Sequence, residues 1–152
     1  MNRHEIALQT KVEHDLLRQV MEGVRISTGW QVAGADASRK LSTLRFITGS
    51  FQRHLERLLA LEEYDGYMDV VSNRSAKLGR MTATLRSEHD TLRGEVRRVV
   101  QSLERLPATD LTALDRTCDE LLALVGRVET HNTKEIDLLQ EAFGQEEGGG
   151  EG

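Results

Sequence analysis

The sequence predicts an all-α fold, an up-down-up-down antiparallel four-helix bundle. Proline occurs once, at Pro107, whereas Leu, Arg, Glu and Ala dominate the chain, and these residue types have high helix propensity. Apolar residues recur at three- and four-residue spacing in four separate segments, the pattern of helices that bury one face. A chain of 152 residues is long enough for one domain with a sizeable core.

Turn-forming residues divide the chain into its four helical segments. We place these at residues 4–27, 39–71, 76–105 and 110–142. Either Thr109 or Asp110 is expected to cap the last helix. The glycine- and glutamate-rich residues 144–152 have nothing to bury, so we expect a domain over residues 1–143 and a disordered tail over 144–152.

The connections after the second and third helices are short, which favours antiparallel neighbours. The first connection is longer and is compatible with the same path. It contains Trp30, which we expect to pack as a lid over the end of the bundle.

Composition excludes several classes of protein. No run of about 18 apolar residues is present, and the first residues lack the apolar stretch of a signal peptide, so we expect a cytoplasmic protein that does not contact a membrane. The single Cys118 excludes an internal disulfide framework and a cysteine-based zinc site, and we expect it to be a small buried residue. The formal net charge of −5 argues against a nucleic-acid partner.

Each apolar stripe contains at least one polar residue where Leu or Val is expected. These residues are His14, Glu62, His89, His131 and Glu135. With a rise of about 1.5 Å per residue, Glu62 and His89 lie within one turn of the same height above the connection near residue 74. His131 and Glu135 are four residues apart, so they share one face of the last helix. The five side chains are therefore expected at one level of the bundle.

A buried carboxylate without a partner costs several kcal/mol, and two facing carboxylates repel each other unless protons or cations intervene. Neutral imidazoles and carboxylates suit iron, manganese or zinc, and facing helices of a bundle build two-metal centres from inward-facing Glu and His. A single histidine on an apolar face is more often a hydrogen-bonded core residue, but five polar groups at one height favour a metal site. His4 and Glu63 are expected to face solvent.

Four segments resemble the hemerythrin-like, or HHE cation-binding, family. They read V-E-H-D-L-L around His14, L-L-A-L-E-E-Y-D-G-Y over residues 58–67, L-R-S-E-H-D-T-L over 85–92, and H-N-T-K-E-I-D-L-L-Q-E-A-F over 131–143. The resemblance implies a four-helix bundle around a non-heme di-iron centre. Carried over by position, it makes His14, Glu62, His89, His131 and Glu135 the iron ligands, with the two glutamates bridging the metals.

The chain departs from the family pattern on the second helix, where the family has H-x-x-x-E. Leu58 stands where the histidine paired with Glu62 is expected. If His54 were that histidine, the acid should instead occupy position 58. We favour Glu62 because its height and the following residues agree with the family, and keep His54 as an alternative ligand. The third helix has Leu85 four residues before His89, so it supplies one histidine.

The leading interpretation is a hemerythrin-like non-heme di-iron protein that binds or senses oxygen, or a related ligand such as peroxide or nitric oxide, and is more a binding protein than an enzyme. The alternative is a metal-poor helical interaction module, with a site degenerated at Leu58 and an acidic surface for an unknown protein partner. The cofactor is then iron, another divalent metal, or none. A hydrolase is disfavoured because no nucleophile elbow or phosphate loop is present.

Overall fold

The structure, a computed structural model, describes residues 3–33, 36–64 and 67–147. Within these residues it contains helices and no strand, which confirms the predicted all-α class. The helices are α1 (Arg3–Gly29), α2 (Asp36–Tyr64), α3 (Met68–Ser72), α4 (Ala76–Arg105) and α5 (Leu111–Glu147). None of the described helices combines the length and the apolar character needed to cross a bilayer.

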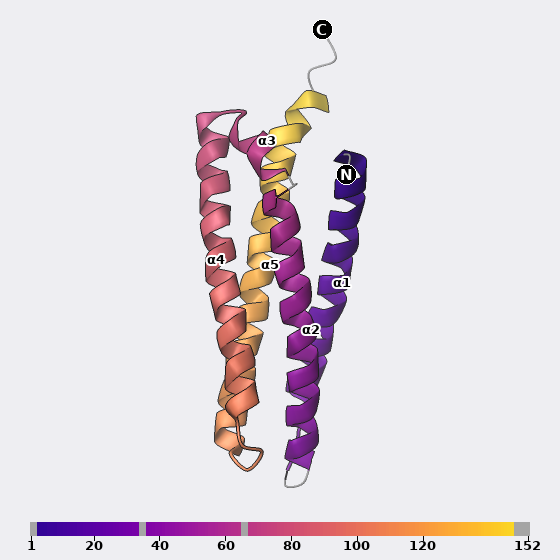
Figure 1. Cartoon of the computed structure of the whole chain (residues 1–152), viewed down its shortest axis with the longest axis vertical. Coiled ribbons are helices and arrows are strands. Elements are labelled where there is room, and N and C mark those ends of the chain that lie inside the picture. Colours follow the sequence, from indigo (N-terminus) through magenta and orange to yellow (C-terminus); the bar gives the residue numbers. More distant parts are fainter. Residues whose placement is uncertain (1–2, 34–35, 65–66, 148–152) are drawn as a thin grey trace.

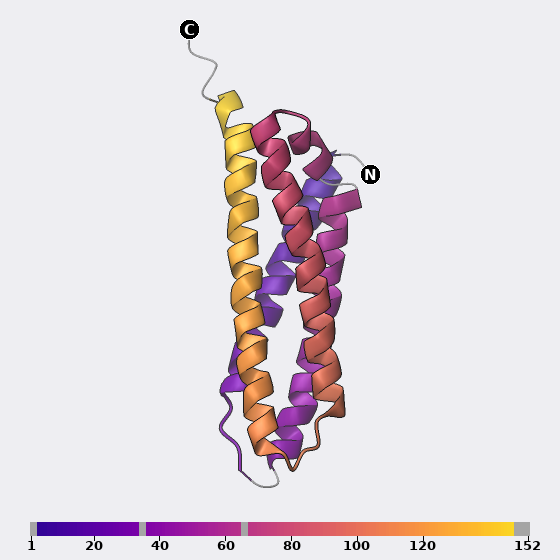
Figure 2. The same ribbon diagram turned by 90° about the vertical axis from the view of Figure 1, so that its left-hand side faces the viewer.

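Four of the helices are long and lie side by side (Figures 1 and 2). Helix α1 packs against α2 and α5, and α4 packs against α2 and α5, so each long helix has two long neighbours around a shared interior. The short helix α3 lies at one end of this arrangement, against α4. The apolar stripes expected from the sequence meet in the interior between the long helices.

Polar side chains define where two of the long helices begin. Ser75 Oγ accepts a hydrogen bond from the backbone N–H of Leu78 at 3.1 Å and caps α4. Asp110 Oδ1 accepts one from the N–H of Ala113 at 3.0 Å, so Asp110 rather than Thr109 caps α5. Such side chains satisfy N–H groups that have no partner within the helix.

The second predicted helix is interrupted. We expected it to run to residue 71, but α2 ends at Tyr64 and the chain resumes as α3 at Met68. Gly66 falls between them, outside the described residues, and glycine costs a helix interior about 1 kcal/mol relative to alanine. After the interruption, α3 lies at one end of the bundle and packs against α4.

The last helix is longer than predicted. It continues to Glu147, into the segment for which we expected disorder, and residues 148–152 lie outside the described residues. Contacts from the α3–α4 connection support this end, because Arg74 donates a hydrogen bond to the carbonyl of Ala142 at 2.8 Å and its guanidinium lies 4.5 Å from the ring centroid of Phe143.

The prediction that Trp30 forms a lid is wrong, because its side chain is 40% exposed. The buried Lys40 holds this end of the molecule instead. Its Nζ donates to the carbonyl oxygens of Thr28 at 3.0 Å and Trp30 at 2.7 Å, which ties the end of α1 to α2. Cys118 is buried as expected, and burial raises the pKa of its thiol.

The apolar interior consists of two clusters. The larger one includes Leu17, Leu55, Leu58, Leu59, Leu92, Leu124 and Val128, and the smaller one comprises Met68, Val71, Leu78, Leu85, Leu138 and Ala142. On α4 the clusters meet on either side of His89, between Leu85 and Leu92. On α5 they meet on either side of His131 and Glu135. A polar layer therefore divides the core at one level.

Candidate metal centre

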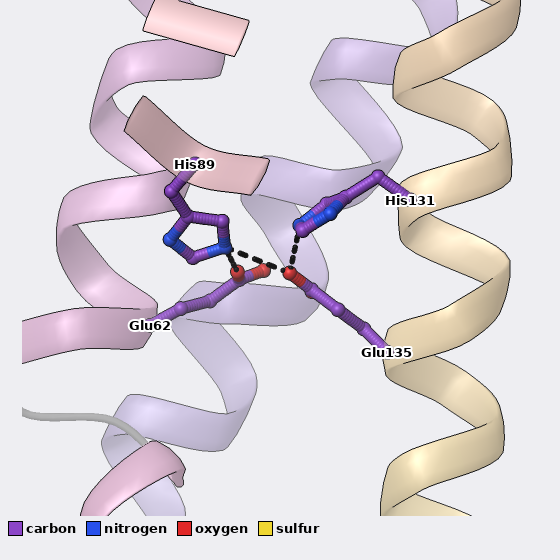
Figure 3. A group of neighbouring side chains, drawn as sticks. All are labelled: Glu62, His89, His131 and Glu135. Atoms are coloured by element: carbon purple, nitrogen blue, oxygen red, sulfur yellow. Dashed lines mark hydrogen bonds and ion pairs between the residues drawn. The ribbon is translucent and has the colours of Figure 1, made fainter. Parts of the chain in front are cut away.

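Four buried side chains from three helices converge in the polar layer. They are Glu62 from α2, His89 from α4, and His131 and Glu135 from α5, and none is more than 2% exposed. One ligand-type atom from each lies within 4.8 Å of those of the others, as Figure 3 shows. The expected convergence of these residues is therefore observed, and their role as ligands remains a prediction.

The imidazoles of His89 and His131 point their Nε2 atoms at the carboxylates. His89 Nε2 lies 3.0 Å from Glu135 Oε1 and 3.2 Å from Glu62 Oε2. His131 Nε2 lies 2.5 Å from the same Oε1 of Glu135 (Figure 3). This arrangement places two nitrogen and two oxygen donors around a single small volume.

His14 approaches the same group from α1. Its Nε2 lies 3.4 Å from Glu62 Oε1, and its side chain is 26% exposed. The two oxygens of Glu62 thus face different imidazoles, with Oε1 towards His14 and Oε2 towards His89. All five residues singled out in the sequence lie at this site.

Glu63 does not face solvent as we expected. Its Oε1 lies 2.7 Å from His89 Nδ1, on the side of the ring that points away from the centre. Its Oε2 accepts a hydrogen bond from Arg93 at 2.8 Å. The prediction failed because α4 packs close beside Glu63 and supplies both partners.

Glu88 contacts Nδ1 of His131, as Glu63 contacts Nδ1 of His89. Its Oε2 lies 2.7 Å from His131 Nδ1, and its Oε1 accepts a hydrogen bond from Lys134 at 2.5 Å. Sequence reasoning did not identify this residue or Glu63 as partners of the histidines. The available signal was an acid directly beside a ligand candidate, Glu63 after Glu62 and Glu88 before His89.

Glu63 and Glu88 determine the tautomer and orientation of the imidazoles of His89 and His131. A carboxylate at Nδ1 favours the tautomer with the proton on Nδ1, which leaves the Nε2 lone pair free to bind a cation. Arg93 and Lys134 in turn hold the pKa values of Glu63 and Glu88 below the usual range despite partial burial. Both imidazoles are therefore oriented before any ligand arrives.

Without a cation, protons must balance the buried charges. Burial works against a charged His89, but Glu135 and Glu62 outweigh it and raise the pKa of His89 to about 9. Burial raises the pKa of Glu62 well above its usual value, whereas His131 and His89 overcome burial and lower the pKa of Glu135. For His14, burial dominates and lowers the pKa.

The buried carboxylate of Glu62 fits a metal-binding role. Both of its oxygens are inaccessible to solvent and make no hydrogen bond of acceptable geometry. Buried polar atoms nearly always have a partner, so such orphaned atoms call for an explanation. A cation between these oxygens and the Nε2 atoms would satisfy them, and the donor set suits a first-row transition metal or zinc.

The structure does not bring His54 into the centre. Its Nδ1 lies 3.4 Å from Glu13 Oε2, and Arg57 lies 3.4 Å from the other oxygen of the same carboxylate. Leu58, one turn before Glu62, is fully buried in the larger apolar cluster. Helix α2 therefore contributes one observed donor, Glu62, to the described cluster.

A surface groove leads to the outer side of the centre. It lies between α4 and α5, has a volume of about 620 Å³, and includes Glu88, His131 and Lys134 in its lining. His131 thus separates the groove from the buried carboxylates.

No protein-family model, curated protein or solved structure matches this chain.

Proposed function

We propose that this chain is a hemerythrin-like protein, an up-down-up-down four-helix bundle that holds a non-heme di-iron centre and binds or senses dioxygen or a related ligand such as peroxide or nitric oxide. The observation that carries the proposal is the buried Glu62 carboxylate, whose two oxygens lack hydrogen bonds and face separate imidazoles. A carboxylate in that position is suited to bridging two cations.

Two groups of donors support a pair of metals over a single one. His89, His131 and the Oε1 of Glu135 lie together on one side of Glu62, while His14 approaches its other oxygen. Two negative charges from Glu62 and Glu135 offset part of the charge of two divalent cations. Three imidazoles and two carboxylates leave coordination positions open to a small ligand.

When bound, ferrous iron supplies electrons to dioxygen-type ligands. The protein's contribution is to orient and protect this chemistry. The apolar clusters above and below the polar layer exclude bulk water, and the outer carboxylates Glu63 and Glu88 hold two imidazoles in place. The groove beside His131 is wide enough for small solutes.

Metal analysis of freshly purified protein tests the proposal. We expect close to two irons per chain and, after aerobic purification, the near-ultraviolet charge-transfer absorption of an oxo-bridged ferric pair. Glu135→Ala should remove most of the iron, whereas Glu120→Ala, an exposed acid on the same helix, should leave iron content unchanged. Equal iron content in both variants would contradict the assignment.

The alternative proposal is a metal-poor helical interaction module. Leu58 at the expected ligand position and the partial exposure of His14 favour it. Such a protein would be purified without metal, and adding ferrous iron would not change its melting temperature. A rise in melting temperature with ferrous iron would reject the module, because a ligand that binds the folded state stabilises it.

A further inference from the structure

The hydroxyl of Tyr67 is buried and makes no hydrogen bond of good geometry, although it lies within reach of the Glu135 carboxylate. The residue follows the interruption after α2 and immediately precedes α3. Its Oη is inaccessible to solvent and makes no hydrogen bond of acceptable geometry. Tyrosine hydroxyls usually find a partner when buried, so this one requires an explanation.

The hydroxyl of Tyr67 lies beside the acids of the metal centre. Its ring packs against the smaller apolar cluster, which covers the polar layer on the α3 side. Burial, the nearby charges of Glu135 and Glu62, and a hydrogen-bonding interaction with Glu135 raise the pKa of its phenol. Tyr67 therefore presents an O–H group to the same enclosed space as the two carboxylates.

Once metal is bound, the predicted ligands Glu62, Glu135, His89 and His131 have no hydrogen-bond donor directed into the centre. The carboxylates of Glu62 and Glu135 are acceptors, and the Nδ1–H groups of His89 and His131 point outward to Glu63 and Glu88. A small ligand that gains negative charge at the centre would therefore meet electron-pair donors from these residues. It would need a hydrogen-bond donor from elsewhere.

We propose that Tyr67 donates a hydrogen bond from its phenol to a small anionic ligand, of the azide or peroxide type, held at the metal centre. This role rests on the proposed di-iron function. Through this hydrogen bond, Tyr67 would favour binding of ligands that carry negative charge. No bond other than this hydrogen bond forms, and the phenol remains protonated.

Azide titration of the iron-loaded ferric protein tests this role. The ligand-to-metal absorption band gives the dissociation constant, and Tyr67→Phe should weaken azide binding about tenfold, the effect of one lost hydrogen bond to a charged acceptor. Iron content should stay at the wild-type value. Tyr64→Phe is the matched control because Tyr64 is 80% exposed, and it should bind azide as the wild type does.

The melting temperature of the metal-free protein separates this role from a structural one. Because the hydroxyl makes no hydrogen bond of good geometry in the metal-free protein, Tyr67→Phe should change that temperature little. Wild-type azide affinity in an iron-loaded Tyr67→Phe protein would overturn the role of Tyr67 and leave the di-iron proposal standing. A wild-type protein that takes up no iron would overturn both.

Discussion

The two halves of the candidate centre differ in how firmly they are held. On the α4–α5 side, His89 and His131 are at most 2% exposed, and each is fixed by a chain of carboxylate and cation, through Glu63 to Arg93 and through Glu88 to Lys134. On the α1–α2 side, the His14 side chain is 26% exposed, and its Nε2 lies 3.4 Å from Glu62 Oε1. The first half is preorganised and the second is loose.

The difference has a local cause on α2. Leu58, one turn before Glu62, is buried in the larger apolar cluster and stands where the proposed centre would have a second-helix histidine, and His54 is paired with Glu13 instead. Glu13 precedes His14 on α1, and its carboxylate pairs with His54 on α2. This ion pair joins α1 to α2 and contributes no donor to the centre. An oriented imidazole loses less freedom on binding metal, which predicts tighter binding on the α4–α5 side.

The largest expected effects come from removing a histidine from each half of the centre, in two separate variants. His131→Ala should weaken iron binding by more than about 100-fold, because it removes an oriented donor whose outer partner alone is worth 10–100-fold. His14→Ala should cost less and lower the iron content towards one per chain. Metal analysis after equilibration with limiting ferrous iron measures both, and an equal loss in the two variants would refute the asymmetry.

The next effect concerns the outer carboxylates. Glu88→Ala and Glu63→Ala should each weaken metal affinity about 10–100-fold, because the imidazole beyond each acid loses its orientation. Glu95→Ala is the control, since Glu95 also pairs with a cation across the α4–α5 interface, and its partner is the guanidinium of Arg127 rather than an imidazole. Competition with a chelator gives the affinities. A loss in Glu95→Ala equal to that in Glu88→Ala would point to surface charge instead.

Strengthening the loose half should have a smaller, opposite effect. Leu58→His places an imidazole one turn before Glu62, and we expect iron occupancy to rise several-fold at limiting iron. Leu58→Ala controls for the lost packing, which should cost about 2–5 kcal/mol of unfolding free energy without a gain in iron. Calorimetry and metal analysis separate the two results. No gain in Leu58→His would mean that position 58 does not face the metals.

The smallest effect is expected at His54. His54→Ala should leave the iron content unchanged and lower the free energy of unfolding by less than about 1 kcal/mol, because Glu13 keeps its contact with Arg57. Thermal unfolding with and without iron measures this. A clear loss of iron would instead make His54 a ligand and reverse the preference for Glu62.

Local patterns were sufficient for most of the fold. Helix propensity and three- to four-residue spacing placed the long helices, because both signals act within one turn of the chain. They were insufficient after Tyr64, where α2 ends, and beyond residue 142, where contacts from Arg74 support more helix. Trp30 was misjudged because the end of α1 is held by the buried Lys40 rather than by an aromatic lid.

The sequence by itself determined that Glu62, His89, His131 and Glu135 lie on apolar stripes at one level of the bundle, since helical rise and periodicity act on each helix separately. Which groups face each other was decided only by the tertiary structure, because the packing of α2 against α4 and of α4 against α5 brings distant residues together. Glu63, Glu88 and Tyr67 gained their positions in this way. Glu63 and Glu88 have imidazole partners only because the neighbouring helices α4 and α5 bring His89 and His131 beside them.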